Sequence, residues 1–474
     1  MEKDIGEHPQ KVNKYACACA IVASMISIIF GYDTGVMSGA MLYVKEEFQI
    51  NDAKTEILAG ILNLCALVGS LSAGRTSDII GRRNTIVIAS LIFLVGSVLM
   101  GYGPNYITLL GGRCVAGVGV GFALMIAPVY SAEISSPASR GVLTSLPEIG
   151  ISVGILLGYF SNYIFSHFVL ELGWRLMLGV AAIPSLFLAI GVLKMPESPR
   201  WLIMKGRLGE AKKIMYKVSN TPEEAEMRLR DIKQAIGIDV NWVWKELLIH
   251  PTPSLRWILL AGVGIHFFEH ATGIEAVILY SHKIFAKAGV HDKRKQILAT
   301  VGVGLTKFTF IVLSTFLIDR VGRRKLLLTS LTGMVVTLCG LGFFLTLAEH
   351  AGGKLFWALV LSIITTYAFV MFFNIGLGPV TWVYSAEIFP LRYRALGAGI
   401  GVAVNRLMNA TVSMSFLSLS NAITIGGSFF MFAGVSLLAL TFFYFFCPET
   451  KGKSLEEMQS VFTRDKQSEN SNNK

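Results

Sequence analysis

The sequence predicts an all-α membrane protein with twelve transmembrane helices in two homologous six-helix bundles and a water-facing helical insert. The composition, the spacing of the apolar segments and an internal repeat support this prediction. Of the 474 residues, 53% are hydrophobic and 15% are charged, whereas a soluble domain has roughly 25% charged residues. Twelve spans of about 20 apolar residues use roughly 240 residues. The chain is therefore long enough for twelve spans, their loops and one polar insert.

The apolar segments form two groups of six. They cover residues 15–40, 57–74, 84–103, 107–130, 141–165 and 175–194, and then 257–285, 297–318, 325–347, 356–384, 396–420 and 424–447. Between the groups, TPEEAEMRLRDIKQAI (221–236) has the charged amphipathic pattern of a water-facing helix. We therefore expect an N-terminal bundle (1–194), a cytosolic helical insert (195–256), a C-terminal bundle (257–447) and a cytosolic tail (448–474).

The charges between the spans predict the orientation. Residues 74–83 carry three arginines and one aspartate, and residues 319–325 carry four basic groups and one acid, which places both loops in the cytosol. Residues 43–56 hold two lysines against four acids and suit an external loop. The basic segment KAGVHDKRKQ (287–296) is also external in this scheme and argues against it. An even number of spans places both termini in the cytosol.

The remaining composition excludes several classes of protein. The net charge of +11 lies in short clusters between apolar segments, so we expect a lipid bilayer as the partner and no nucleic acid. The six cysteines lie in or beside apolar stretches without metal-like spacing. We expect no metal and no cofactor. The polar N-terminus leads into an apolar run without a cleavage site, which indicates a cytosolic tail and not a signal peptide.

Short motifs recur in the same order in both halves. VYSAEI occurs at 129–134 and 383–388, and GRR occurs at 81–83 and 322–324. MPES at 195–198 is echoed by CPET at 447–450. Three echoes in one order indicate two homologous halves, which is the organisation of transporters with a substrate site at the interface of two repeats.

Five motifs together resemble one known family. They are GRTSDIIGRR (74–83), PVYSAEI (128–134), PESPRWL (196–202), DRVGRR (319–324) and PETKG (448–452). The chain resembles the sugar porter family of the major facilitator superfamily over essentially its whole length. GYDTGVMSGAM (31–41), LPEIGISVGILLGY (146–159) and FFEHATGIEAVILYS (267–281) are most similar to plant polyol and monosaccharide transporters coupled to protons.

The resemblance implies the major facilitator fold and a proton-coupled symporter in the plasma membrane. Such a symporter imports a neutral polyhydroxylated molecule, a polyol or a monosaccharide, by alternating access, and we expect it to act as a monomer. A passive facilitator and a sugar sensor with a transporter-like fold are the alternatives. The chain has no GxxxxGK[ST] loop and no HExxH helix, so we expect no enzyme.

Opposite charges at the cytosolic ends are candidates for gating. Pairs between the bundles could hold the inner ends together while the outside is open; the alternative is solvated charges that only fix the orientation. The candidates are Asp78, Arg82, Arg83, Glu133, Arg140, Glu197 and Arg200 in the first half, and Asp319, Arg323, Arg324, Glu387, Arg392, Arg394 and Glu449 in the second.

Ionisable residues inside the spans are functional candidates because burying each one costs several kcal/mol. They are Asp33, Arg113, Glu148, Glu269, His270, Glu275, Lys307 and Arg406. A structural ion pair is the alternative for any one of them. The resemblance implies that Asp33 pairs with Arg113 and accepts the transported proton.

The resemblance also implies a substrate site on the fifth, seventh, eighth, tenth and eleventh spans. The candidates there are Glu148, Glu269, His270, Glu275, Tyr280, Lys307, Asn374, Trp382 and Asn405. Charged or ionisable groups stand at five positions where hexose facilitators have amides, and this difference puts a narrow hexose specificity in doubt. Carboxylates accept more hydrogen bonds than amides and suit linear polyols or several sugars. Lys307 is a candidate counter-charge for Glu148 or Glu275.

Overall fold

The computed structural model describes residues 13–135, 140–235, 249, 251–350, 355–389 and 393–451. Within these residues the regular structure is entirely α-helical. The first half contains α1 (Lys14–Phe48), α2 (Asp52–Ile80), α3 (Arg82–Tyr102), α4 (Tyr106–Ile134), α5 (Arg140–Phe165), α6 (Leu170–Gly179) and α7 (Ala182–Leu193). Three short helices follow, namely α8 (Pro199–Met204), α9 (Leu208–Val218) and α10 (Pro222–Ala235).

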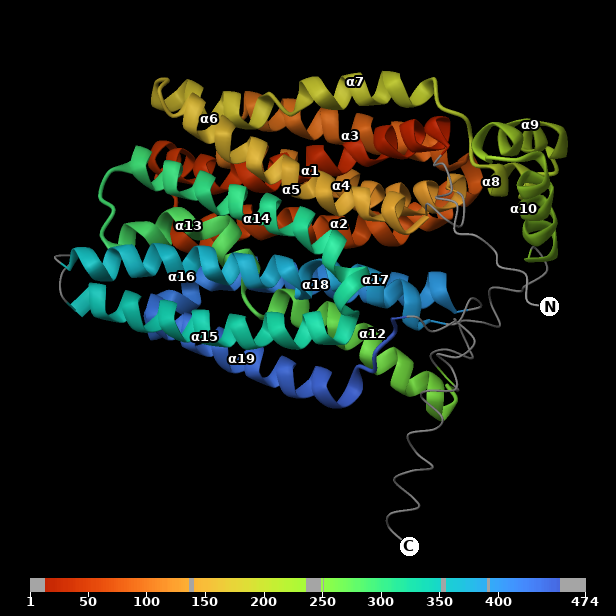
Figure 1. Cartoon of the computed structure of the whole chain (residues 1–474). Helices are drawn as coiled ribbons and strands as arrows, with labels where there is room; N and C mark the ends of the chain where they lie inside the picture. The colour runs from red at the N-terminus through yellow and green to blue at the C-terminus, as the bar shows by residue number, and fades with distance from the viewer. Residues whose placement is uncertain are drawn as a thin grey trace, which may run out of the picture.

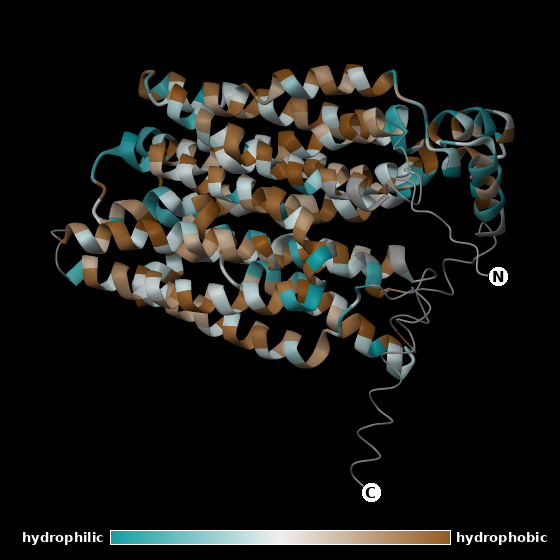
Figure 2. Ribbon diagram, viewed as in Figure 1, coloured by the Kyte–Doolittle hydropathy of each residue, from teal (hydrophilic) through white to brown (hydrophobic). Residues whose placement is uncertain are grey.

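The second half contains the remaining helices. They are α12 (Pro253–Ala271), α13 (Ile274–Ala288), α14 (Lys293–Val321), α15 (Arg323–His350), α16 (Phe356–Ile375), α17 (Leu377–Ile388), α18 (Arg394–Ile423) and α19 (Ile425–Phe446). The long helices run roughly side by side, with α1–α7 in one half of the molecule and α12–α19 in the other (Figure 1). The three short helices form a polar group at one end, called here the insert end (Figure 2).

Among the described residues, eleven helices or broken helices are long and apolar enough to cross a membrane. The twelfth predicted span is α18, which is 30 residues long. Asn405, Arg406 and Asn409 are buried on it and lower its hydropathy. With α18 included, the arrangement confirms the predicted all-α fold with a helical insert.

Three of the predicted spans are broken in the middle. The sixth divides into α6 and α7 before Pro184, which lacks the N–H that a continuous helix would use. The seventh divides at Gly273, where φ is +87°, a region that favours glycine. The tenth divides at Gly376, where a Cβ would lie 2.5 Å from the carbonyl oxygen of Leu326. Each of the three breaks falls inside a segment that the sequence predicts as one span.

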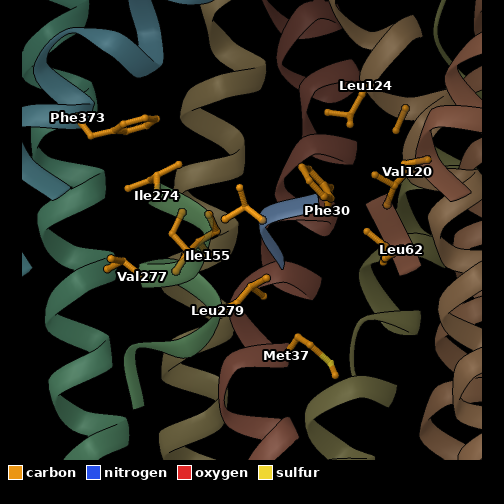
Figure 3. Close-up of a cluster of buried hydrophobic side chains, with 14 of the residues drawn as sticks. Phe30, Met37, Leu62, Val120, Leu124, Ile155, Ile274, Val277, Leu279 and Phe373 are labelled. Carbon is orange, nitrogen blue, oxygen red and sulfur yellow. The ribbon is translucent and has the colours of Figure 1, made fainter. Parts of the chain in front are cut away.

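The two halves share a continuous apolar core. Buried side chains of α1, α2, α4 and α5 belong to the same cluster as those of α13 and α16. Figure 3 draws 14 residues of the cluster; the labelled ones include Ile155 of the first half and Ile274, Leu279 and Phe373 of the second. Between the halves, α2 packs extensively against α18, and α5 packs against α14. The interface between the halves is therefore a packed surface along these two helix pairs.

Glycines allow α1 and α5 to pack closely. A Cβ at Gly154 of α5 would lie 2.1 Å from the carbonyl oxygen of Ile28, and one at Gly31 would lie 2.0 Å from that of Ile151. Glycines 117 and 121 of α4 face α2 in the same way. Small residues at helix contacts are the usual means of close packing in membranes, so the GVGVG run serves helix packing.

We expect Gly154→Leu to destabilise the protein because the new side chain meets backbone atoms, and overpacking costs about 1–3 kcal/mol or more. The measurement is the melting temperature of the detergent-purified protein. Gly434→Leu is the matched control, because a Cβ there has open space around it within 4 Å. Equal melting temperatures for the two variants would show that Gly154 does not determine the helix approach.

Candidate functional site

The break between α12 and α13 gathers acidic and imidazole side chains. Glu269 and His270 lie in the last turn of α12, and Glu275 lies in the first turn of α13. Their exposed fractions are 4%, 5% and 6%. His270 Nδ1 lies 3.2 Å from a carboxylate oxygen of Glu275. The left-handed backbone at Gly273 turns the chain so that these groups face one another.

Helix α18 contributes a second set of polar groups to the same place. Asn405 donates to Glu269 at 2.6 Å, and the Arg406 guanidinium donates to Asn405 Oδ1 at 2.5 and 3.0 Å. Asn409 lies one turn further on, with Nδ2 3.5 Å from His270 Nδ1. We name the set of Glu269, His270, Glu275, Asn405, Arg406 and Asn409 the polar cluster. It combines hydrogen-bond donors and acceptors in an otherwise apolar interior.

Side chains of neighbouring helices surround the polar cluster. Lys307 of α14 lies 3.5 Å from Asn374 Oδ1 of α16, and its charge acts on Glu269 and Glu275. Glu148 of α5 is partly exposed, and its charge acts on Arg406. Of the two predicted counter-charges of Lys307, Glu275 thus interacts with it electrostatically, and its described hydrogen-bond contact is Asn374.

Two aromatic candidates have different surroundings. Trp382 of α17 is partly exposed and packs edge-on against His266, with ring centroids 5.4 Å apart. His266 Nδ1 in turn lies 3.7 Å from Glu269. Tyr280 is fully buried, donates to the carbonyl oxygen of Ser413 at 2.7 Å and stacks on Phe416. Trp382 therefore borders the polar cluster, whereas the hydroxyl of Tyr280 already holds α13 against α18.

A separate buried ion pair lies within the first half. Arg113 of α4 donates to Asp33 of α1 at 2.5 Å, and both side chains are at most 2% exposed. The same guanidinium donates to the carbonyl oxygens of Leu58 and Ala59 of α2. The pair predicted from the sequence is thus present, and the arginine ties together three helices.

The gating candidates form two similar networks at the insert end. In the first half, Arg82 binds Glu133 at 3.0 Å and Asp78 at 2.9 Å. Glu197 accepts from the backbone N–H groups of Arg82 and Arg83 at 2.9 and 3.1 Å. Burial raises the pKa of the Glu197 carboxyl, and hydrogen bonds from these N–H groups oppose the rise.

The second half repeats this arrangement. Arg323 binds Glu387 at 2.7 Å, and Glu449 accepts from the backbone N–H groups of Arg323 and Arg324 at 2.9 and 3.1 Å. Gly81 and Gly322 precede these arginines with φ of +98° and +100°. The GRR echo therefore corresponds to the same turn, capped by a carboxylate at the start of a helix.

Each of these described pairs stays within one half, although the sequence suggested contacts between the bundles. Arg200 is exposed. Arg392 and the side chains of Arg140, Asp319 and Arg394 lie outside the described residues. The insert is attached to the first half, since Arg228 of α10 donates to the carbonyl oxygen of Ser135 at 2.7 Å and Asn13 donates to that of Ser219 at 2.9 Å.

The opposite end has polar contacts between the halves. Asp52 of α2 binds Lys283 of α13 at 3.1 Å and accepts from Asn421 of α18 at 3.3 Å. Glu56 accepts from the backbone N–H and hydroxyl of Ser418 at 2.7 and 2.5 Å. We call these contacts, together with the Lys293–Glu46 pair at 2.5 Å, the outer-end network. They hold the halves together at this end.

The outer-end network explains the basic segment that argued against the predicted topology. Lys293 belongs to that segment and pairs with Glu46 of the acidic first loop. Both segments therefore lie at the end away from the insert. Their opposite charges join the two halves there.

Sequence reasoning missed several members of the polar cluster. Arg406 was recognised as an ionisable group in a span but had no assigned site, and Asn409 was not singled out. Asn405 and Asn409 are four residues apart and therefore lie on one helix face. This spacing in the sequence was a signal that the two residues belong to one site. The structure also places His266, a buried histidine of α12, between Glu269 and Trp382.

Comparisons with known proteins agree with this architecture. The family profile "Sugar (and other) transporter" matches residues 19–462. The chain is 64% identical to "Probable polyol transporter 6" of Arabidopsis thaliana, with 97% of each chain covered. It is 66% identical to "Probable polyol transporter 3" of the same plant, covering 95% of this chain and 92% of the relative.

A more distant relative also matches over nearly the whole chain. "Glucose transporter GlcP" of Staphylococcus epidermidis is 34% identical, with 95% of this chain and 97% of that protein covered.

Solved structures have the same fold. The proton:xylose symporter XylE bound to 6-bromo-6-deoxy-D-glucose, of the major facilitator superfamily, superposes with a TM-score of 0.80 at 26% identity, covering 95% of this chain and all of that one. The inward-open conformation of the xylose transporter XylE from E. coli gives 0.78 at 26% identity, covering 94% and 100%. The predicted class, a multi-pass transporter and not an enzyme, is confirmed by this kinship. The chain belongs to the sugar transporter family of the major facilitator superfamily.

Proposed function

We propose that the protein is a proton-coupled symporter that imports polyols or monosaccharides into the cytosol. The observation that carries the proposal is the polar cluster, a buried set of donors and acceptors between helices of the second half and beside Glu148 of the first. Hydroxyl-rich molecules need such groups, and Trp382 adds an aromatic face for their C–H surface. The kinship to proteins named polyol transporters supports this substrate class.

The proton site in this proposal is Asp33, with Arg113 as its partner. The proton affinity of a buried carboxylate depends strongly on whether a cation faces it. If the pair separates and re-forms as the halves move, Asp33 binds and releases a proton once in each cycle. The named function of XylE as a proton:xylose symporter supports coupling in a protein of the same fold.

The moving units in this proposal are residues 1–194 and 257–447, with the insert (195–256) on the first unit and a cytosolic tail (448–474). In this proposal the outer-end network is the contact that closes the external end. The protein works as a monomer in the plasma membrane with both termini in the cytosol. The repeated networks of Arg82 and Arg323 stabilise the inner ends of each unit and could exchange partners when the inside closes.

Labelled uptake tests the substrate class. Cells that lack their own transporters would express the protein and receive sorbitol, mannitol, xylose and glucose in turn. We expect saturable uptake of at least one polyol or monosaccharide, reduced by a protonophore. Absence of uptake for the whole panel, with the protein present at the cell surface, would contradict the proposal. Uptake insensitive to the protonophore would instead identify a passive facilitator.

The carboxylates Glu148 and Glu275 are expected to set the selectivity. A buried acceptor that loses its partner hydroxyl costs about 1–3 kcal/mol, which is roughly a five- to hundredfold change in preference. Changing both residues to amides, Glu148→Gln with Glu275→Asn, should shift preference from linear polyols to pyranose sugars. The measurement is the ratio of sorbitol to glucose uptake, and a constant ratio would exclude both residues from recognition.

The outer-end network is expected to limit opening to the outside. Asp52→Asn weakens its contacts with Lys45 and Lys283. Because the Asp52 side chain is 34% exposed, each pair contributes only about 0.2–1 kcal/mol. The outward-facing population should rise and lower the external KM roughly two- to fivefold. Glu349→Gln is the control, since Glu349 pairs with Lys287 within the second half. Equal KM values in both variants would contradict the assignment.

A further inference from the structure

The charges in and around the polar cluster do not balance. Glu148, Glu269 and Glu275 all act on the guanidinium of Arg406, and Lys307 acts on Glu269 and Glu275. With neutral histidines, three carboxylates therefore face two permanent cations. An unbalanced charge away from water is strongly unfavourable. The cluster becomes neutral when it binds one proton.

The neighbouring helices supply no further charge among their described residues. Helix α16 contributes the amide of Asn374, α17 contributes the Trp382 indole, and α1 contributes the Phe30 ring, 5.8 Å from the Arg406 guanidinium. Asp33 and Arg113 form an ion pair with each other, so their charges balance. When the substrate excludes water, the missing positive charge therefore has to come from a titratable group of the cluster itself.

The geometry offers places for that proton. His270 Nδ1 lies 3.2 Å from Glu275, and its Nε2 has no hydrogen-bond partner in the part of the chain that the structure describes. His266 stands 3.7 Å from Glu269, and neither of its ring nitrogens has a described hydrogen bond. A carboxylate next to an imidazole can share one proton, so the proton belongs to the set and not to one residue.

We propose that Glu269, His270 and Glu275, with His266 beside them, form a second proton-binding site that fills when the substrate binds. The proposal rests on the function proposed above, because the substrate occupies the same cluster. A neutral polyol displaces the water that screens the excess negative charge, and a desolvated charge is costly. The cluster then takes one proton from solvent and returns it to solvent when the substrate leaves.

Binding calorimetry on the purified protein tests the proposal. The background variant is Asp33→Asn, which removes the first proton site, and the probe is sorbitol in two buffers of different ionisation enthalpy. We expect uptake of about one proton for each sorbitol bound and a Kd that rises up to tenfold per pH unit above neutrality. Proton uptake near zero in this background would overturn the second site.

Two further variants keep the test independent of any one side chain. Adding Glu269→Gln or Glu275→Gln to Asp33→Asn removes one negative charge and should replace the proton, so binding should become insensitive to buffer and pH. Adding Glu349→Gln, away from the cluster, should leave the proton uptake in place. Unchanged uptake in both cluster variants would overturn the proposal.

The same experiment separates the two proposals. If the wild-type protein binds no compound of a panel of polyols and monosaccharides, the proposed function fails and the second proton site fails with it. If it binds sorbitol without proton uptake in the Asp33→Asn background, only the second site fails.

Discussion

Asp33→Asn is expected to remove most of the substrate accumulation while exchange across the membrane survives. The asparagine keeps the size and the hydrogen bond to Arg113 but removes the titration. One pH unit supplies about 1.4 kcal/mol, and 100 mV adds about 2.3 kcal/mol for one charge. Together these could sustain roughly 500-fold accumulation of a neutral substrate for each proton carried with it, and the variant should lose the factor that the Asp33 proton contributes.

The measurement for Asp33 compares steady-state accumulation with counterflow in the same cells. Counterflow requires only binding and the movement of the loaded halves, so it serves as the control for folding and insertion. A variant that still concentrates substrate as strongly as the wild type would remove Asp33 from the coupling mechanism. Loss of both accumulation and counterflow would show that the Asp33–Arg113 pair is needed for the movement itself.

Trp382→Ala is expected to weaken uptake at least tenfold. The indole is partly exposed beside the polar cluster and packs against His266, so it offers apolar area and one N–H donor to a bound molecule. Trp382→Phe should restore part of the affinity because it keeps the aromatic face. The measurement is the KM of sorbitol uptake for both variants.

A tryptophan at the rim of the second half provides the matched control. Trp357 lies in the first turn of α16 and is 50% exposed, far along the helix from Asn374. Trp357→Ala should change uptake little. Unchanged affinity of Trp382→Ala for every compound tested would place the indole outside the substrate site.

The repeated motifs made the two halves predictable from the sequence. Gly81 and Gly322 each precede two arginines, and the structure gives both the same positive φ and the same carboxylate cap. The Asp33–Arg113 pair followed from family resemblance, and the burial of both residues required an opposite charge nearby. These features depend on local patterns or on one contact that burial makes necessary.

Other features depend on distant contacts and were not predictable. The breaks at Gly273 and Gly376 lie inside segments that hydropathy predicts as single spans, and Gly376 is required by its close approach to Leu326. The pairing of Lys293 with Glu46 joins residues 247 positions apart. Arg406 became a site residue only because Asn405 and the three carboxylates surround it. Hydropathy and spacing within one segment contain no information on such partners.

Proteoliposomes with an imposed proton gradient test the central claim most directly. The purified protein would be reconstituted with labelled sorbitol outside, with either an acidic exterior or equal pH on both sides. We predict that the internal concentration rises well above the external one with the gradient and only reaches it without the gradient. Equal final concentrations under both conditions would contradict proton coupling.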